Sequence, residues 1–411
     1  MTLLPVAPRP STPPTAADLD RWRAADEGAR PARLSMLRER LARDRIDAYL
    51  GVSRENTRYL TGFELRDGEE KVAGDSGRFL VSQDEVVVLA DSRYREQAGD
   101  QCPRARIEDV YHDLPARWPA LVASLRPIAG GPRVRRIAAE AGLVPHELWT
   151  ALTLANPAVE LVPARGWVEE LRATKDESEL ERVAAACAVA DAALERLLPN
   201  IRPGVTEHEL AMRLEWDMRS AGAEALAFDV ACLSGPRAAL PHGSPGSRVV
   251  SSGEVLLFDF GAQVAGYRSD MTRTLFVGAP TDRDRGIHAT VAAAQEAAFG
   301  LLAEAAARGD SPAGPEVDRA ARAVVEAAGH GAHFGHGLGH GIGLATHELP
   351  TVSFRGGDEP LPTPTVFSVE PGIYLPGETG VRIEDLVVFD LEARSARIVT
   401  TFPRGVTVVG G

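Results

Sequence analysis

The sequence predicts a two-domain α/β protein, and three observations lead to this fold class. The chain has 411 residues, which suits two domains that each bury a core. In its first part, a helical pattern of apolar residues leads into short apolar strands. In its second part, two helices followed by a strand hairpin occur twice. This repetition predicts a domain of pseudo-duplicated α-α-β-β halves.

Residues 1–30 are predicted to form a flexible, proline-rich extension. Five prolines fall between Met1 and Pro14, and a charged segment, Ala17–Arg30, follows them. We expect this segment to become ordered only against a neighbour. The extension holds no cationic stretch followed by a long apolar run, which argues against a signal peptide.

Residues 31–165 are predicted to form the first domain. Its expected elements are an amphipathic helix with Leu34, Leu37, Leu41 and Ile46 on one stripe, strands at 48–52, 78–82, 85–90 and 134–138, and a helix at 145–154. The polar stretch 64–77 is interpreted as a solvated loop. No residue of this domain suggests catalysis.

Residues 166–411 are predicted to form the second domain. Asp176 begins a helix whose first turn is acidic, and Thr206 opens the next helix with a capping box. Two further helices are expected at 283–307 and 315–328. Each helix pair leads into two strands that carry acidic residues.

Four acidic residues interrupt apolar strands, where an unpaired charge would be costly to bury. They are Asp259, Asp270, Glu370 and Glu384. The glycine-containing turns between the strands predict two hairpins, which would bring each pair of acids to one sheet surface. Two halves that face each other would place the first pair opposite the second.

A glycine-rich stretch, residues 335–344, lies in the densest group of histidines. Five of the ten histidines fall in or beside it: His330, His333, His336, His340 and His347. The glycines are expected to leave room for a ligand or metal against the backbone. A structural histidine usually stands alone, whereas imidazole is a preferred ligand of several divalent metals. Four carboxylates and one imidazole would bridge two divalent ions.

The composition argues against several kinds of partner. Lysine and arginine number 45 against 58 acidic residues, a net charge of −13, which disfavours nucleic acid and anionic membrane surfaces. No stretch is long and apolar enough to span a bilayer. Cys102, Cys187 and Cys232 lack CxxC spacing and predict reduced thiols in a cytoplasmic protein.

Residues from about 170 to 405 carry a series of short motifs. These are PHG at 241–243, DFG at 259–261, SDMTRT at 269–274, GHGIG at 339–343, HE at 347–348, VEPG at 369–372 and RIED at 382–385. In this order and spacing they resemble the pita-bread metallopeptidases, which include methionine aminopeptidase, aminopeptidase P and prolidase. The resemblance implies that the metal ligands are Asp259, Asp270, His340, Glu370 and Glu384.

The first domain narrows this resemblance. The stretches NTRYLTGF at 56–63 and ADSRY at 90–94 resemble the N-terminal domain shared by creatinase, prolidase and aminopeptidase P. Methionine aminopeptidases lack this domain, which argues against methionine removal. Creatinase works without metal and does not keep the ligand set, so the five intact ligands argue against it.

The resemblance implies a dinuclear-metal hydrolase that cleaves the peptide bond between an N-terminal residue and proline, preferentially in Xaa-Pro dipeptides. An Xaa-Pro aminopeptidase acting on longer peptides, a non-hydrolytic binding protein and a non-peptide metalloenzyme are the alternatives. Carboxylate-rich ligation favours manganese, with zinc or cobalt as other candidates. The family commonly pairs its subunits, so a homodimer is expected, with the loop 64–77 as a candidate lid over the partner's site.

The resemblance also implies catalytic roles. Glu370 is expected to take a proton from the attacking water and pass it to the leaving nitrogen, because a metal-bound carboxylate at the edge of the site reaches both. His242 and His347 are expected to hydrogen-bond the tetrahedral intermediate, and His336 to wall the site for the residue after the scissile bond. A turn residue beside proline is the structural alternative for His242.

Two arginines are candidates for binding substrate. Arg382 lies two positions from Glu384 on the same strand face, so it would orient that ligand or meet the substrate carboxylate. Arg355, on the glycine-rich loop 353–358, would reach the site if the loop bends inward, and an arginine fork matches a carboxylate. An ordinary exposed loop arginine is the alternative for Arg355. Recognition of the free carboxylate of proline would favour dipeptides.

Overall fold

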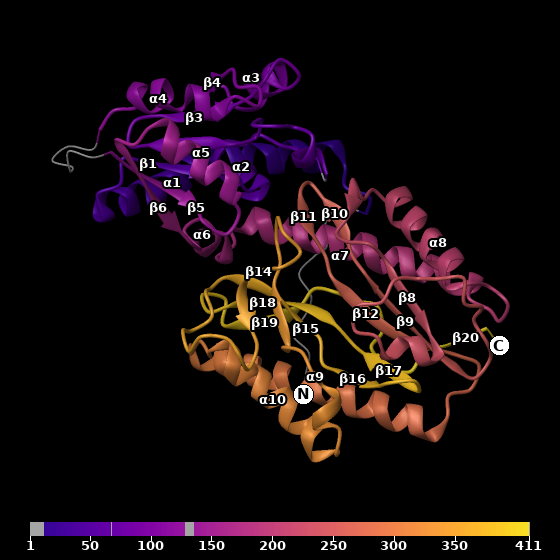
Figure 1. Cartoon of the computed structure of the whole chain (residues 1–411). Coiled ribbons are helices and arrows are strands. Elements are labelled where there is room, and N and C mark those ends of the chain that lie inside the picture. Colours follow the sequence, from indigo (N-terminus) through magenta and orange to yellow (C-terminus); the bar gives the residue numbers. More distant parts are fainter. Residues whose placement is uncertain (1–11, 67, 128–134, 411) are drawn as a thin grey trace. The chain divides into compact units, whose positions relative to one another are not determined.

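The computed structural model shows a chain that forms two compact units (Figure 1). It describes residues 12–66, 68–127 and 135–410. One unit is built from residues 23–172, and the other from residues 173–410 together with residues 12–22. The predicted domain boundary after residue 165 lies before the observed one.

Buried hydrogen bonds explain this later boundary. The Asn56 side-chain amide donates to the Glu169 carboxylate at 2.7 Å and accepts from the Arg172 guanidinium at 2.8 Å. Asn56 also donates to the buried Glu140 at 2.8 Å. Residues 166–172 therefore belong to the first unit. The motif NTRYLTGF at 56–63 contributes to the stability of this unit through Asn56.

The first helix, α1, runs without interruption over Ala16–Asp44. The prediction of a flexible extension is therefore wrong for residues 16–30, whereas residues 1–11 lie outside the described part of the chain. Trp22 is 1 % exposed, and its indole N–H donates to the Glu181 carboxylate at 2.8 Å. A buried aromatic side chain thus anchors a segment whose composition alone looks unstructured.

The unit of residues 23–172 is built on a six-stranded mixed sheet in the order β4-β3-β2-β1-β5-β6. After α1, its elements are β1 Ala48–Gly51, α2 Arg54–Thr61, η1 Glu69–Lys71, β2 Phe79–Ser82, β3 Val86–Leu89, α3 Arg95–Gln101, β4 Arg106–Glu108, α4 Leu114–Ser124, β5 Arg135–Glu140, α5 His146–Ala155, β6 Val159–Ala164 and α6 Glu169–Ala173. The four predicted strands and the helix predicted at 145–154 are confirmed, except that Val134, the predicted start of one strand, lies outside the described residues. Their apolar runs supply a core around Trp118.

The predicted polar loop at 64–77 is partly built into this unit. Its helical turn η1 is followed by Asp75 and Ser76, which are both buried. The Asp75 carboxylate accepts a hydrogen bond from the backbone N–H of Leu114 at 3.0 Å. The interpretation as a solvated loop is therefore wrong for the part next to β2, because the hydrogen bond with Leu114 holds Asp75 in the interior.

The other unit repeats one order of elements. The first half contains α7 Glu177–Leu197, α8 Glu207–Ser220, β8 Ala231–Ser234, β9 Glu254–Phe260 and β12 Met271–Val277. The second half contains α9 Asp282–Arg308, α10 Gly314–Ala327, β13 Gly339–Gly341, β15 Thr365–Val369 and β18 Asp385–Asp390. The predicted α-α-β-β duplication is confirmed, and so is the capping box at Thr206.

Shorter elements connect the members of the two halves. They are η2 Leu198–Asn200, β7 Ala225–Leu226, η3 Gly235–Ala239, β10 Ala262–Val264, β11 Tyr267–Arg268, η4 Gly331–His333, β14 Glu348–Val352, β16 Gly372–Leu375, β17 Thr379–Arg382, β19 Ser395–Ile398 and β20 Val408–Val409. Of these, β16 and β17 form a separate two-stranded ladder.

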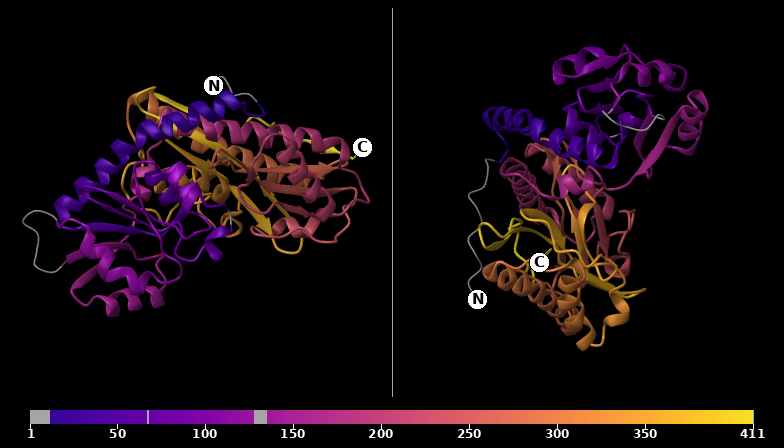
Figure 2. Two further views of the ribbon diagram at one scale, coloured as in Figure 1. Left: turned by 90° about the horizontal axis from the view of Figure 1, so that it is seen from above. Right: turned by 90° about the vertical axis from the view of Figure 1, so that its left-hand side faces the viewer.

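The strands of this unit lie between its two helix pairs (Figures 1 and 2). One sheet has the order β20-β12-β9-β8 and packs with α7 and α8, and the other has the order β14-β13-β15-β18-β19 and packs with α9 and α10. Each half therefore has a core of its own. The sheets meet where the backbone N–H of Glu384 donates to the carbonyl oxygen of Thr272 at 3.1 Å. This contact joins the acid-bearing ends of both hairpins.

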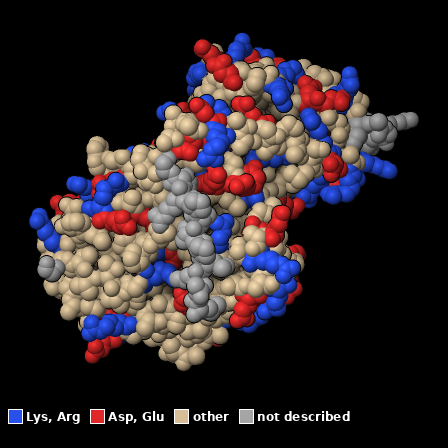
Figure 3. All heavy atoms as spheres, turned by 180° about the vertical axis from the view of Figure 1, so that it is seen from behind, with Lys and Arg blue, Asp and Glu red and all other residues tan. Residues whose placement is uncertain are grey.

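Charged side chains of both signs are interspersed on the face shown in Figure 3. The acidic excess of the chain is thus spread among basic residues on this face. Within the described ranges, no helix combines the length and the hydropathy needed to cross a membrane.

Candidate metal centre

The two hairpins bring the predicted acids together. In the ladder of β9 and β12, Asp259 lies opposite Thr272, and Asp270 directly precedes β12. Glu370 directly follows β15, and Glu384 directly precedes β18, which is the antiparallel partner of β15. Backbone pairing therefore places two carboxylates on each half, at the ends where the halves meet.

These acids line a cavity of about 410 Å³. Its walls include every predicted metal ligand, Asp259, Asp270, His340, Glu370 and Glu384. They also include four other predicted site residues, His242, His336, His347 and Arg382. A cavity of this size suits a small ligand.

Asp270, His340 and Glu384 form the tightest group. One potential ligand atom from each lies within 4.8 Å of the others. His340 Nε2 lies 3.8 Å from Asp270 Oδ2 and 3.4 Å from Glu370 Oε1. Several carboxylate oxygens with one imidazole nitrogen form a donor set that suits divalent cations such as manganese.

Burial and like charge leave the site short of positive charge. Burial, followed by the neighbouring Glu384 and Asp259 carboxylates, raises the pKa of Asp270 well above its usual value. The pKa of Glu384 is also well above its usual value, through burial and then the charges of Glu370 and Asp259. Burial likewise raises the pKa of Glu370. Among the described lining residues, Arg382 is the only lysine or arginine, so the donor set fits a cation.

His340 is held as a neutral imidazole. Burial lowers its pKa, and its Nδ1 lies 3.1 Å from the carbonyl oxygen of Gly341. Because a carbonyl oxygen only accepts hydrogen bonds, Nδ1 carries the proton. The lone pair of Nε2 therefore faces the carboxylates.

Hydroxyl groups hold two of the carboxylates. Ser368 Oγ donates to Glu370 Oε1 at 3.1 Å, and Thr272 Oγ1 donates to Glu384 Oε2 at 2.7 Å. These neutral donors orient the acids without supplying a competing positive charge.

Arg382 contacts Asp259 rather than Glu384. Its Nη2 donates to Asp259 Oδ2 at 2.5 Å, and its Nε donates to Thr272 Oγ1 at 2.8 Å. Its link to Glu384, which was predicted as one of two alternatives, runs through the Thr272 hydroxyl. The reason is that the Arg382 side chain crosses from β17 to β9, so it reaches Glu384 only through Thr272.

Tyr374 belongs to the site, and sequence reasoning missed it. Its hydroxyl lies 2.9 Å from His336 Nε2 and accepts a hydrogen bond from Arg382 Nη1 at 2.9 Å. His336 Nδ1 donates to the carbonyl oxygen of Gly337 at 2.8 Å, so Nε2 accepts a hydrogen bond from the Tyr374 hydroxyl. Burial raises the pKa of Tyr374 to about 12. A tyrosine in an apolar strand soon after Glu370 was the available signal, since its buried hydroxyl needs a partner.

His347 and His242 face the same cavity. The ring of His347 lies against that of His340, with 4.0 Å between the centroids. Burial, followed by the nearby His340 and His242, lowers the pKa of His347 to about 4. His347 is therefore neutral at neutral pH and can donate one hydrogen bond.

Three predicted residues lie away from the cavity lining. His330 and His333 are adjacent, with ring centroids 5.7 Å apart. These two histidines lie at and beside η4, which precedes β13, so the histidine cluster is divided between the cavity and a place outside its lining. Arg355 is exposed and lies over the Phe354 ring at 5.0 Å.

Comparison with known proteins identifies the family of this chain. Residues 181–390 match metallopeptidase family M24, and residues 33–174 match the creatinase/prolidase N-terminal domain. The uncharacterized peptidase YqhT of Bacillus subtilis (strain 168) is 33 % identical over 377 residues, which cover 92 % of this chain and 100 % of that protein. The Xaa-Pro dipeptidase of Pyrococcus furiosus is 39 % identical over 221 residues, which cover 54 % of this chain and 62 % of that protein.

Solved structures resemble most of the chain. An Xaa-Pro dipeptidase from Bacillus anthracis has a TM-score of 0.80 at 33 % identity, covering 92 % of this chain and 99 % of that one. An X-Pro aminopeptidase from Thermotoga maritima MSB8 has a TM-score of 0.78 at 34 % identity with the same coverage. These likenesses confirm the predicted fold class, a creatinase-like α/β domain followed by a pita-bread domain. The chain is therefore a peptidase that belongs to metallopeptidase family M24 and carries a creatinase/prolidase N-terminal domain.

Proposed function

We propose that this peptidase is a dinuclear-metal hydrolase that cleaves the bond between an N-terminal residue and proline, preferentially in Xaa-Pro dipeptides. The observation that carries this proposal is the convergence of buried carboxylates and one neutral imidazole in a single cavity. Similarity to proteins named Xaa-Pro dipeptidases supports the substrate class. Manganese suits the oxygen-rich donor set, and zinc and cobalt are the other candidates.

The ligands would be Asp259, Asp270, His340, Glu370 and Glu384. Two divalent cations held there would acidify water and stabilise negative charge on the attacked carbonyl oxygen. Glu370 takes a proton from the attacking water and passes it to the proline nitrogen, and Ser368 keeps its carboxylate in place. His347 and His242 donate hydrogen bonds to the carbonyl oxygen as charge develops on it.

His336 walls the part of the cavity that receives proline. Burial lowers the pKa of His336, so its ring is neutral at neutral pH. Tyr374 links this ring to Arg382, which in turn binds Asp259. These connected side chains hold His336, which would contact proline, at a fixed position relative to Asp259, a proposed metal ligand.

A dipeptide preference needs a group that binds the carboxylate of proline. Arg382 lines the cavity, but its guanidinium already donates to Asp259 and Thr272. Arg355 lies just beyond Ser353, a lining residue, so movement of this loop would bring it to the substrate. Cleavage of longer peptides is the second candidate function, favoured by the similarity to an X-Pro aminopeptidase.

A peptide-length series tests the proposal. Hydrolysis of Xaa-Pro and of Xaa-Pro-Yaa is measured with the protein loaded with manganese, zinc or cobalt. Faster hydrolysis of the dipeptide is the expected result. Equal or faster cleavage of the tripeptide would establish the aminopeptidase instead, and binding without cleavage under every metal would identify a non-hydrolytic protein.

The role of Arg355 is tested by replacing it with glutamine. Loss of a carboxylate contact should raise the KM for Xaa-Pro about tenfold and relax the preference against tripeptides. Arg319→Gln is the matched control, since Arg319 is also exposed and does not line the metal-centre cavity. An unchanged KM in Arg355→Gln would remove Arg355 from the substrate site.

We propose that the protein forms a homodimer in which the loop 64–77 contacts the partner. Exposed apolar side chains beside this loop support the proposal, because Val72 is 62 % and Tyr111 59 % exposed. Arg93 lies between them, donating to the Val72 carbonyl oxygen and covering the Tyr111 ring. Light scattering should give the mass of a dimer, and a fully active monomer would contradict it.

We also propose a cytoplasmic location. Its support is that Cys102, Cys187 and Cys232 are buried and form no disulfide among the described residues. Cell fractionation with an antibody to the chain tests this, and recovery outside the cytoplasm would refute it.

A further inference from the structure

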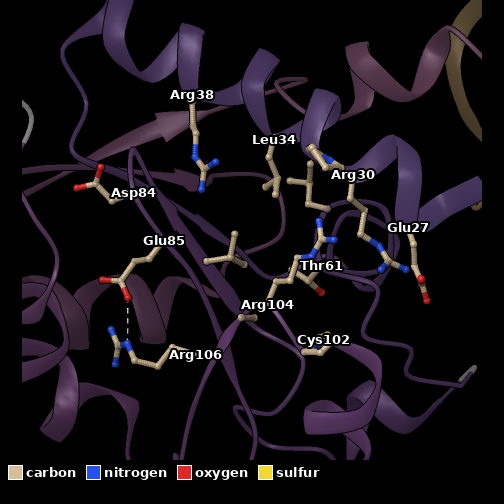
Figure 4. Close-up of a pocket in the computed structure, with 15 residues that line it drawn as sticks. Glu27, Arg30, Leu34, Arg38, Thr61, Asp84, Glu85, Cys102, Arg104 and Arg106 are labelled. Atoms are coloured by element: carbon tan, nitrogen blue, oxygen red, sulfur yellow. Dashed lines mark hydrogen bonds and ion pairs between the residues drawn. The ribbon is translucent and has the colours of Figure 1, made fainter. Parts of the chain in front are cut away.

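The unit of residues 23–172 contains a second cavity, which plays no part in the metal centre. Its volume is about 550 Å³, within the usual range for a small-molecule site. One wall is the part of α1 from Glu27 to Arg38, and the opposite wall is the stretch from Cys102 to Arg106 (Figure 4). The end of α2 and the start of β3 complete it.

Three arginines of this cavity have no acidic partner. Arg30, Arg38 and Arg104 line it, and none forms an ion pair with an acidic residue of the described chain. The side chains of Arg38 and Arg104 extend from opposite walls toward the space between them (Figure 4). Such a group is unexpected in a chain whose acidic residues outnumber its basic ones.

The surroundings of each guanidinium favour binding of an anion. The Nε of Arg30 is buried and has no hydrogen-bond partner in the described structure. Arg38 donates from Nε to the carbonyl oxygen of Ser82 at 2.9 Å, and no hydrogen bond of its Nη groups to a described residue is found. Burial lowers the pKa of Arg38, a cost that an anion would offset. Arg104 is exposed, so a ligand from solvent can reach its guanidinium.

The acidic residues of the cavity are mostly committed elsewhere. Glu85 accepts from Arg106 Nε at 3.0 Å, and Arg106 also binds Glu108 at 2.6 Å. Asp84 lies 3.4 Å from the Arg126 guanidinium. Asp84 also acts on Arg38 by its charge, without forming an ion pair, so Asp84 and the exposed Glu27 face three arginines.

We propose that this cavity binds a small organic oxyanion, with its charged group among Arg30, Arg38 and Arg104 and its apolar part against Leu34, Leu60 and Val86. Arginine forks match the oxygens of carboxylate, sulfate and phosphate groups with paired hydrogen bonds. Leu60 and Val86 are buried side chains of the cavity lining, so they offer an apolar surface beside the charged groups. The proposal is independent of the peptidase reaction.

Titration calorimetry on the full chain tests the proposal with benzenesulfonate and benzoate, and with benzyl alcohol as the uncharged control. We expect one anion to bind per chain, more weakly as salt rises, and with the same affinity after divalent metal has been removed with a chelator. Tighter binding of benzenesulfonate would indicate a tetrahedral phosphate-like or sulfate-like group, and tighter binding of benzoate a carboxylate. Both outcomes support the site. Equal binding of benzyl alcohol, or loss of binding on metal removal, would overturn it.

Variants locate the binding. Arg38→Gln and Arg104→Gln should each weaken benzenesulfonate or benzoate binding about tenfold, the loss of one charge-assisted contact. Arg104 is exposed, so its variant should fold normally even if Arg38→Gln does not. Arg43→Gln is the matched control, because Arg43 lies on the same helix, is 68 % exposed and does not line the cavity. Unchanged affinity in Arg104→Gln, or an equal loss in Arg43→Gln, would refute the proposal.

Discussion

At the residue scale, the metal centre is a group of like charges that neutral donors hold in place. Ser368 and Thr272 donate to two of the carboxylates, and a single guanidinium, that of Arg382, binds a third. Burial and the neighbouring carboxylates raise the pKa values of Asp270 and Glu384, and a bound cation would stabilise their ionised forms. The side chains of the site are therefore arranged for a ligand that carries positive charge.

Replacing Asp270 by Asn should lower metal content and reduce turnover at least about a hundredfold, because an amide replaces a charged ligand. The fold should persist, since the change also relieves repulsion in the metal-free site. Metal analysis and peptide hydrolysis measure both effects. Asp282→Asn, at a fully exposed position, is the control. Retention of two ions with normal activity would show that Asp270 is not a ligand.

Replacing Tyr374 by Phe should lower turnover about tenfold while metal content stays unchanged, the cost of about one buried hydrogen bond. The hydroxyl connects His336 to Arg382, and neither is a metal ligand in our assignment. Tyr111→Phe removes an exposed hydroxyl and serves as the control. If Tyr374→Phe lost metal, Tyr374 would instead support the ligands themselves.

At the scale of elements, the glycine stretch allows strands to approach closely. A Cβ on Gly339 would lie 1.9 Å from the carbonyl oxygen of Ser368, and one on Gly341 would lie 2.1 Å from that of Leu349. Neighbouring backbone thus fills the space that a side chain would need at both positions, and Gly339 also lines the cavity. Their role is to let β13, which carries His340, pack against its neighbours.

Gly339→Ala should destabilise the fold by about 1–3 kcal/mol and weaken metal binding, because the added methyl group pushes β13 away from Ser368. Gly335→Ala is a matched control from the same stretch, since a Cβ there meets no atom within 4 Å. Thermal unfolding and metal titration distinguish the two variants. Equal unfolding temperatures and metal affinities in both variants would mean that the close approach of β13 to Ser368 contributes to neither stability nor metal binding.

At the scale of the whole molecule, metal binding and stability are linked through pH. Without metal, the folded-state pKa values of Asp270 and Glu384 lie above their unfolded values. The folded chain then holds more protons than the unfolded chain, so the stability of the metal-free protein falls as pH rises from about 4 toward those folded-state values. Metal binding requires the deprotonated acids, so the apparent metal affinity rises with pH.

Removing metal should therefore lower the unfolding temperature more at about pH 8 than at about pH 5. Calorimetry of the metal-loaded and metal-free protein across this range measures the difference. Asp270→Asn removes one titrating group and should flatten the pH dependence of the metal-free form. If the difference in unfolding temperature between the metal-loaded and metal-free protein became smaller as pH rises, the proposed linkage would be contradicted.

The sequence by itself determined the candidate ligand set and the repeated order of elements. Asp259 and Asp270, like Glu370 and Glu384, are recognisable because burying an unpaired charge in an apolar strand is costly. Such a charge is evident from the residues on either side of it. Helix starts such as the capping box at Thr206 are also local, since the interacting groups are three residues apart. The structure places the predicted ligands around one cavity.

Only the tertiary structure decided which side chains meet across the sheets. Arg382 reaches Asp259, 123 residues away, because β17 and β9 are brought together. Burial of Trp22 makes a helix of a segment that composition predicts to be flexible. The unpaired arginines Arg38 and Arg104 share a cavity although no pattern connects them. The spacing of hydrophobic residues and the placement of a charge within an apolar strand can be seen among neighbouring residues. The contacts named here depend on how distant elements pack, and a local sequence pattern carries no information about that packing.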